Sequence, residues 1–395
     1  MELIYTREPF PTHVKKSIFL AGPTPRKRTT PSWRIPGAIK ILEELGYDGH
    51  VFIPENRDGP REEDINNQEY KHQIAWERIG LNRADLIVFW VPRNLTTMPA
   101  FTTNVEFGLW VRSGKIVYGA PPDLPRNKYL ELTADRQDVP RFQTLKDTLD
   151  FAVSYIGGGA ERNGGECDIP LHIWNAKSFQ LWYEGLKTAG NILEGAEVLW
   201  CSRKNAKGSF VYRWILQARI FIASENRFKT SEFDFALSRT DTSATVLWQE
   251  AFNPLNTKIV LVKEFRPSGR TPDGFIHELP SGSSPQWWLT PEEIALEEIK
   301  EETGKEFEKC RLVAHGSRQV AGTFSAHHTH LFSIRLKPEE IEYFETNARN
   351  RTVFGNIAEG EQTSLEVKTL GEIIETRLLD WSTVGMIMQT ILEGR

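Results

Sequence analysis

The N-terminal part of the chain alternates short apolar runs with amphipathic stretches. The apolar runs are Ser17–Ala21, Val51–Ile53, Leu86–Trp90 and Ile116–Tyr118. Between them, apolar side chains recur at helical spacing near residues 38–45, 76–81 and 105–111. Buried strands separated by helices are typical of a parallel sheet covered on both faces. The pattern predicts a doubly wound α/β domain that binds its ligands at the carboxyl ends of the strands.

A glycine-rich segment, residues 157–169, separates this pattern from a different one. We predict a first domain over residues 1–156, a linker over 157–169 and a second domain over 170–395. The second domain begins with a helical stretch near residues 174–193 and then becomes rich in strands. A strong helical pattern over residues 291–303 interrupts the strands, so this half is expected to be α+β.

Composition narrows the class of protein. A chain of 395 residues with 39% hydrophobic and 26% charged residues is globular and has room for two cores. The net charge of -5 gives no general attraction to nucleic acid or anionic lipid. Three scattered cysteines form neither a disulfide framework nor a zinc site. Without a secretion signal or an apolar span, we expect a cytoplasmic protein that binds neither membranes nor nucleic acid polymers.

Polar residues follow or flank the apolar runs of the first half. The candidates for binding a ligand are Gly22, Pro23, Arg26, Arg93 and Asn104, and those for catalysis are the carboxylates Asp85 and Glu106. Each also has a simpler explanation: a turn, a satisfied loop carboxylate, or an acid in the first turn of a helix that stays ionised beside the exposed amides. Their occurrence together near the strand ends favours a shared ligand-binding and catalytic site over these separate explanations.

Residues 15–135 resemble the nucleoside 2-deoxyribosyltransferases and their nucleotide N-glycosidase relatives. The resemblance rests on FLAGPTPR, the SWR of Ser32–Arg34, VFIPE, AD before an apolar run, and FTTNVEFG followed by SGK. It implies that Glu106 attacks the anomeric carbon and that Asp85 holds the departing base. The acid that the transferases carry shortly before the nucleophile is not evident, and Asn104 is expected to bind sugar hydroxyls instead. Transfer and hydrolysis therefore both stay open, and the resemblance makes a homo-oligomer possible.

The second half carries ELPSG, which starts at Glu278, and an acidic helix. Glu298, Glu301 and Glu302 lie at i, i+3 and i+4, so a helix places them on one face, where like charges repel. A bound Mg²⁺ or Mn²⁺ would relieve this repulsion, because hard cations prefer carboxylate oxygen. The alternative is an acidic helix face exposed to solvent.

This combination resembles the Nudix hydrolases, in particular the ADP-ribose pyrophosphatase branch, over residues 210–380. The resemblance implies a metal held by the three glutamates and diphosphate hydrolysis, with Glu359 or Glu361 as the base. Arg266 and Glu278 are expected to contact substrate. Two positions depart from the family: Glu297 replaces an arginine, and Leu289 replaces a glutamate.

The two resemblances together predict a bifunctional enzyme of nucleotide metabolism. One half would cleave or transfer at an N-glycosidic bond of a nucleoside or nucleotide. The other would hydrolyse an ADP-ribose-like or nucleoside diphosphate substrate with Mg²⁺. The alternative is that the second half is a weak or inactive nucleotide sensor that regulates the first.

Overall fold

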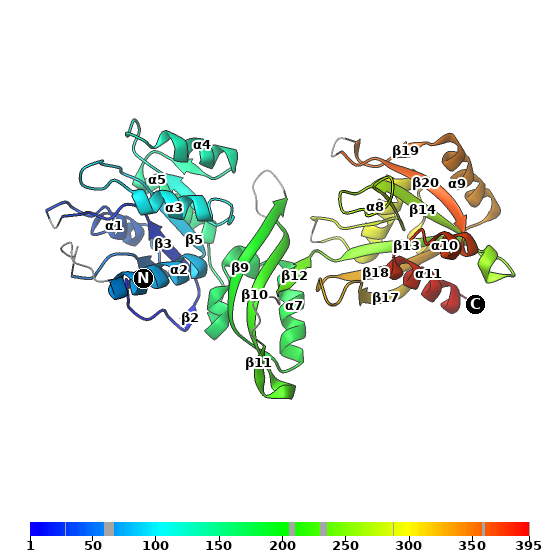
Figure 1. Ribbon diagram of the computed structural model, residues 1–395, viewed down its shortest axis with the longest axis horizontal. Coiled ribbons are helices and arrows are strands. Elements are labelled where there is room, and N and C mark those ends of the chain that lie inside the picture. The colour runs from blue at the N-terminus through cyan, green and yellow to red at the C-terminus, as the bar shows by residue number, and fades with distance from the viewer. Residues whose placement is uncertain are drawn as a thin grey trace. The chain divides into compact units, whose positions relative to one another are not determined.

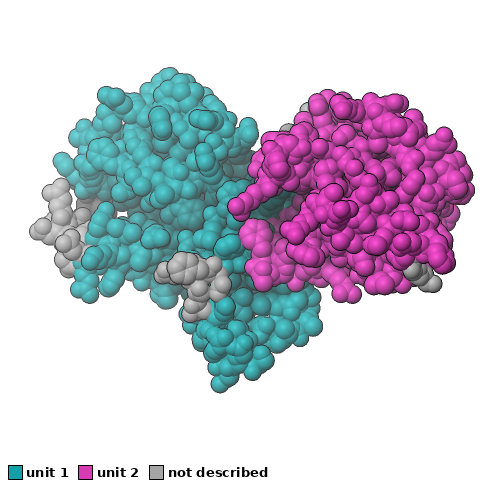
Figure 2. Space-filling view, turned by 45° about the vertical axis from the view of Figure 1, so that its right-hand side comes forward, with its two compact units in different colours: residues 1–237 teal, residues 238–395 magenta. Residues whose placement is uncertain are grey.

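The chain forms two compact units, Met1–Leu237 and Ser238–Arg395, which Figure 2 colours separately. The computed structural model describes residues 1–27, 29–58, 67–204, 210–229, 235–286, 288–357 and 360–394. The division after Leu237 differs from the linker predicted at residues 157–169. That segment instead forms β8 (Arg162–Asn163) and the 3-10 helix η1 (Gly164–Asp168) inside unit 1.

Unit 1 is built on a six-stranded sheet whose neighbouring strands are all parallel. Its order is β1 (Glu2–Tyr5), β4 (His50–Ile53), β3 (Ser17–Ala21), β5 (Leu86–Trp90), β6 (Ile116–Gly119) and β7 (Arg141–Phe142). The four central strands are the apolar runs of the sequence, and the arrangement fits the predicted doubly wound fold. The edge strands β1 and β7 were not predicted.

Helices cover both faces of this sheet (Figure 1). One face packs on α1 (Gly37–Glu44) and α5 (Leu145–Ile156), and the other on α2 (Asn67–Arg83), α3 (Phe101–Trp110) and α4 (Lys128–Arg136). Alternation along β3 supplies both cores, since Phe19 faces α2 while Ile18 and Leu20 face α1. Because both faces are buried, the strands are apolar throughout rather than alternating.

The chain reverses its direction across the sheet between β3 and β5. After β3 it proceeds to β4 on one side, whereas after β5 it proceeds to β6 on the other. The carboxyl ends of β3 and β5 therefore form the point where doubly wound sheets bind ligands. Gly22 follows β3 there with a φ of +149°, and a Cβ at this position would lie 2.2 Å from the carbonyl oxygen of Trp90. Only glycine lets the turn approach the end of β5 so closely.

The remainder of unit 1 is a helical segment followed by a long antiparallel hairpin. The helices are α6 (Leu171–Trp174) and α7 (Lys177–Thr188), and the strands are β9 (Ile192–Lys204), β10 (Phe210–Ile222) and β11 (Arg227–Lys229). The strand β12 (Ala236–Arg239) begins in unit 1, and its last two residues belong to unit 2. The helix predicted over residues 174–193 is thus two helices and the start of a strand. Trp214 and Phe179, both fully buried, centre the core between α7 and the hairpin. A short pairing of β2 (His13–Val14) with β8 joins this segment to the sheet region.

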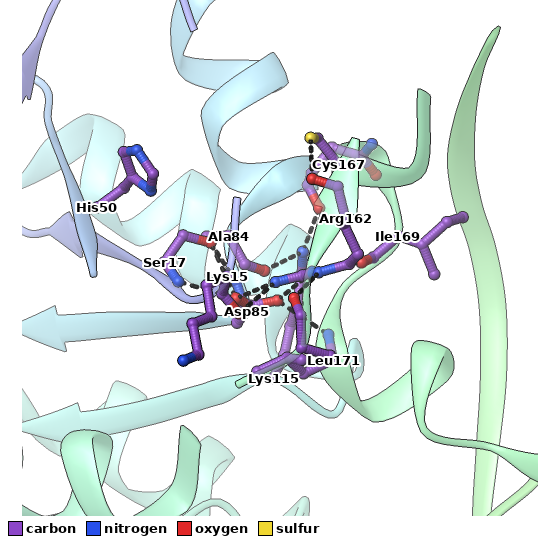
Figure 3. Close-up of polar contacts among 12 residues, drawn as sticks. Lys15, Ser17, His50, Ala84, Asp85, Lys115, Arg162, Cys167, Ile169 and Leu171 are labelled. Carbon is purple, nitrogen blue, oxygen red and sulfur yellow. Dashed lines mark hydrogen bonds and ion pairs between the residues drawn. The ribbon is translucent and has the colours of Figure 1, made fainter. Parts of the chain in front are cut away.

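A buried ion pair fixes the segment before α6 to the start of β5 (Figure 3). The two guanidinium Nη atoms of Arg162 lie 2.6 and 2.7 Å from the two carboxylate oxygens of Asp85. Arg162 also donates to the carbonyl of Ile169, and Asp85 accepts from the backbone N–H groups of Ser17 and Leu171. Both side chains of the ion pair are fully buried. The two buried side chains therefore make their hydrogen bonds to groups of the protein and need no water.

Unit 2 is a mixed sheet with helices around it, which agrees with the α+β order predicted. The main path of the sheet is β17 (Val313–Gln319), β18 (His328–Arg335), β13 (Thr242–Gln249), β14 (Lys258–Phe265), β20 (Thr363–Thr369) and β19 (Val353–Phe354). Two short strands, β15 (Phe275–Glu278) and β16 (Ser281–Gly282), pair with β14 and β13. The helices are α8 (Pro291–Thr303), α9 (Pro338–Asn350), α10 (Leu370–Thr376) and α11 (Trp381–Glu393).

Helix α8 occupies the residues that the sequence pattern predicted, and its ends explain why. The hydroxyl of Thr290 accepts from the backbone N–H of Glu293, whose side chain accepts from the N–H of Thr290 in return. Pro291 at the first helical position suits this start, and Gly304 ends the helix with a φ of +68°.

We predict that Arg162→Met destabilises unit 1 by about 3–5 kcal/mol, because Asp85 is then left as a buried charge without its partner. The measurement is urea unfolding of the full chain. Arg141→Met is the matched control, because Arg141 pairs with Asp135 at the surface, where the side chain of Arg141 is 40% exposed and that of Asp135 is 50% exposed. The control should lose less than about 1 kcal/mol. Equal losses in the two variants would contradict the role given to Arg162.

Candidate functional site

An open cleft with a volume of about 1340 Å³ lies in unit 1. It extends from the turn at Gly22 along α2 and α3 to Lys115 and the strand β9. Charged, polar and apolar side chains share its lining, as in most sites for small molecules. The cleft therefore begins at the carboxyl ends of β3 and β5, where the topology predicts a ligand.

Glu106 lines this cleft from α3. The prediction that it lies in the first turn of its helix was wrong, because α3 begins at Phe101 and Glu106 is in the second turn. The free amides of the helix start are then too far away to hold the carboxylate ionised. Burial instead raises the pKa of Glu106 to about 8, and the charge of Glu77 adds to this shift.

Glu77 is the functional candidate that the sequence reasoning missed. It lines the same cleft from α2, and Gln73 donates a hydrogen bond of 2.9 Å to its Oε1. Burial raises the pKa of Glu77 as well. A signal was available, since Glu77 lies one helical turn before the buried Leu81 and directly after the buried Trp76. An acid beside the core-facing side of a helix is uncommon unless it has a partner or a function.

Arg34 is the buried cation behind the two acids. Its guanidinium donates to the carbonyls of Leu20 and Gly22 and, at 2.5 Å, to Oε1 of Glu55. The side chain of Arg34 is fully buried, and its charge lowers the pKa values of Glu77 and Glu106 against the larger effect of burial. The SWR and VFIPE motifs thus supply an internal ion pair that shapes the turn at Gly22.

The structure brings some of the predicted binding residues together and not others. Gly22, Pro23 and Arg26 line the cleft with Glu106. Arg93 and Asn104 do not line it, and they bind each other instead, with 2.6 Å between Nη2 and Oδ1. Arg93 also donates to the carbonyl of Pro99 and to Asn127, so its contacts hold the loop that precedes α3.

Asp85 lies at the amino end of β5, and it is not among the residues of the cleft lining. Both of its carboxylate oxygens are engaged by Arg162 and by backbone N–H groups, as Figure 3 shows. The geometry therefore agrees with the simpler explanation of Asp85, a loop carboxylate whose hydrogen bonds are all made within the protein. Glu77, unlike Asp85, shares the cleft with Glu106, and Asp168 and Glu197 also line it.

A buried lysine closes the other end of the cleft. The ammonium of Lys115 donates to the carbonyls of Asn82 and Ala84, at 2.5 and 2.8 Å. Burial lowers the pKa of Lys115 to about 7. His172 and Cys201 lie beside it in the lining, with 3.8 Å between Nε2 and Sγ. Burial raises the pKa of the Cys201 thiol, so this thiol is not an activated nucleophile.

Unit 2 gathers carboxylates in the C-terminal half of α8. Glu302 accepts a hydrogen bond of 2.9 Å from the backbone N–H of Ser281, and the carboxylate of Glu298 lies against Gly282. Burial raises the pKa of Glu298 to about 7, with Glu301 and Glu361 adding to the shift, and raises that of Glu302 well above its usual value. Such shifts mean that these acids lack enough positive charge around them.

The other predicted residues of unit 2 lie around the same acids. Arg266, which is expected to contact substrate, lies 2.7 Å from Glu264 and 3.7 Å from Glu278, so it is paired with carboxylates. Glu361 is exposed, and Glu359 lies outside the described residues. The oxygen-only donors of Glu298, Glu301 and Glu302 are of the type that Mg²⁺ prefers. Among the residues described, however, no group of three or more His, Cys, Asp or Glu side chains is arranged to hold a metal ion.

Comparison with known proteins supports the resemblance to the nucleoside 2-deoxyribosyltransferases for part of unit 1. Residues 15–124 match the family model described as nucleoside 2-deoxyribosyltransferase like. The match includes Arg34, Glu77 and Glu106, and it ends before β9. No curated protein matches the chain. Over the part of the chain that the structure describes, no helix has both the length and the apolar character needed to cross a membrane.

We predict that Glu77→Gln lowers the pKa of Glu106, because a neighbouring negative charge is removed while burial is unchanged. The measurement is ¹³C NMR titration of labelled glutamate side chains, with the Glu106 signal assigned from Glu106→Gln. Glu43→Gln, at an exposed position of α1 on the other face of the sheet, is the control and should leave the titration unmoved. An unchanged midpoint in Glu77→Gln would show that the two acids do not interact.

Proposed function

We propose that unit 1 cleaves or transfers at the N-glycosidic bond of a nucleoside or nucleotide. The observation that carries this proposal is the pair of acids, Glu106 and Glu77, in a cleft at the ligand-binding end of the sheet. The match of residues 15–124 to the deoxyribosyltransferase-like family makes nucleoside chemistry the natural use of the pair. Enzymes that break glycosidic bonds commonly divide the work between two carboxyl groups.

In the proposed reaction, one oxygen of the Glu106 carboxylate bonds to the anomeric carbon as the carbon–nitrogen bond to the base breaks. The electron pair of the broken bond goes to the base nitrogen, and a proton from Glu77 neutralises the departing base. Glu77, then ionised, takes a proton from water or from an acceptor base. That acceptor attacks the anomeric carbon and releases Glu106, so both carboxyl groups return to their starting states.

The turn from Gly22 to Arg26 is proposed to hold the sugar or its phosphate. It is a strand-to-loop turn with a cation, Arg26, that lines the cleft beside Glu106. At Gly22 the turn carries no side chain, because a Cβ there would lie 2.2 Å from the carbonyl oxygen of Trp90. Which acceptor completes the reaction, water or a second base, is decided by assaying nucleosides with and without a free base present.

Glu106→Gln is predicted to lower glycosidic cleavage by at least about 10³-fold, because an amide cannot form the covalent intermediate. Glu77→Gln is predicted to slow the release of poor leaving bases by about 10²–10⁴-fold and that of activated bases less. Chromatographic detection of released base from purine and pyrimidine nucleosides and nucleotides measures both effects. A folded Glu106→Gln protein with wild-type activity would exclude Glu106 as the nucleophile.

The pH dependence of kcat/KM separates the roles of the two acids. Because the pKa of Glu106 is about 8, the group is protonated below that pH and ionised above it. A nucleophilic Glu106 therefore makes kcat/KM rise with pH up to about 8, since this ratio reports the ionisation of the free enzyme. A ratio that instead falls through this range would give Glu106 the role of proton donor and Glu77 that of nucleophile.

We propose as a second candidate function that unit 2 hydrolyses the diphosphate of an ADP-ribose-like molecule or a nucleoside diphosphate. The specific observation in its favour is the raised pKa of Glu298 and Glu302, two acids that approach the ELPSG segment. A divalent ion held by Glu298, Glu301 and Glu302 would supply neutralisation of the diphosphate and activation of water. The side chains that the structure describes form no group of three or more arranged to hold such an ion.

Mg²⁺ at millimolar concentration is predicted to raise the melting temperature of unit 2, because an ion that binds only the folded state adds about 2.7 kcal/mol at a hundredfold excess over Kd. Glu302→Gln should lessen this shift and remove diphosphate hydrolysis. Calorimetry of the full chain with and without Mg²⁺, together with phosphate-product assays on ADP-ribose, measures both. Glu375→Gln, at an exposed position of α10, is the control. Nucleotide binding without Mg²⁺ response or hydrolysis would favour the sensor alternative.

A further inference from the structure

The strand β9 forms a wall of the cleft that contains Glu77 and Glu106. Residues 196–201 of this strand line the cleft, although they lie outside the family-matched residues 15–124. The site of this chain therefore has a component that the matched domain alone does not provide. Trp200 is its largest side chain.

Two contacts hold β9 in place on either side of Trp200. The side-chain amide of Asn82, at the end of α2, donates at 2.9 Å to the carbonyl of Ala196. The thiol of Cys201 donates at 3.4 Å to the carbonyl of Ser113, just after α3. The wall is thus attached to both helices that carry the two acids.

A β-bulge determines that Trp200 faces outward. Ala196 and Val198 pack against the core of Trp214, and simple alternation would place Trp200 beside them. The register shifts between Trp200, opposite Ile215, and Val198, opposite Leu216, so Leu199 is an extra residue. The extra residue reverses the alternation. Cys201 then enters the core, while Trp200 remains 47% exposed.

The indole of Trp200 has no aromatic or cation–π partner among the described residues, and it makes no hydrogen bond there. Leu199, which is 50% exposed, adds apolar surface beside it. A planar, half-exposed ring in the wall of a cleft is the type of surface on which a base stacks, since every base has a π-face.

Resting on the proposed glycosidic activity, we infer that Trp200 is a specificity residue on which the base of the bound nucleoside or nucleotide stacks. Stacking contacts bind the base in the ground state and do not act on the breaking bond. Trp200 therefore affects KM, and its loss weakens the binding of purine substrates more than that of the smaller pyrimidine substrates. The wall contributed by β9 would in this way set the preference among bases.

The test compares Trp200→Ala, Trp200→Phe and the control Ile192→Ala, an exposed residue of β9 that does not line the cleft. For cleavage of 2′-deoxyadenosine 5′-monophosphate, Trp200→Ala should raise KM about 5- to 100-fold with kcat little changed. The KM of Trp200→Phe should stay within about threefold of the wild-type value, and the KM of Ile192→Ala should equal the wild-type value. Inhibition by 2-deoxyribose 5-phosphate, which lacks a base, should be the same in all four proteins.

Calorimetric titration of the same nucleotide into Glu106→Gln, with and without Trp200→Ala, separates this inference from the proposed function. Weaker binding on loss of Trp200 supports the stacking subsite even if the wild type cleaves no nucleotide. Cleavage with an unchanged KM in Trp200→Ala overturns the subsite and leaves the activity standing. Equal loss of affinity for the nucleotide and for 2-deoxyribose 5-phosphate also overturns it, because the effect is then not on the base.

Discussion

The buried pair of Asp85 and Arg162 is the interaction on which the arrangement of unit 1 depends. It ties the start of the central strand β5 to the segment that leads into α6, α7 and the hairpin. Charges this deep are stable only while each has its partner. The pair thereby joins the sheet, on which the helices with Glu77 and Glu106 pack, to the segment that leads into the strand at the wall of their cleft. Asp85, which the sequence suggested as a catalytic residue, contributes to the structure through this ion pair.

Both units contain acids whose surroundings oppose ionisation. In unit 1 the acids are Glu77 and Glu106, with Arg34 as the compensating cation; in unit 2 they include Glu298 and Glu302, near Arg239. A carboxyl group whose pKa is raised toward neutral pH can give and take protons there, which a fully solvated carboxylate does poorly. Raised pKa values also arise in purely structural clusters, so the position of Glu77 and Glu106 in a cleft matters as much as their shifts.

The sequence predicted the central strands of unit 1 and helix α8 well, because buried apolar runs and a capping box are local signals. It predicted Glu106, Gly22 and Arg26 in one place, since parallel strands end at one edge of a sheet. The ion pair of Asp85 could not be predicted, because its partner, Arg162, is 77 residues away in a segment that looked like a linker. Glu77 was missed because its meaning depends on the packing of α2 beside α3. The match to the family does not extend to unit 2, whose resemblance to Nudix hydrolases stays a prediction.

The extra residue at Leu199 has a consequence for how this site can change. One residue more or fewer in β9 would exchange inward and outward positions along the strand, which would turn the Trp200 side chain from the wall toward the core. The acids on α2 and α3 would be untouched by such a shift. A single codon gained or lost could therefore remodel this wall of the cleft in one step, without any change at Glu77 or Glu106.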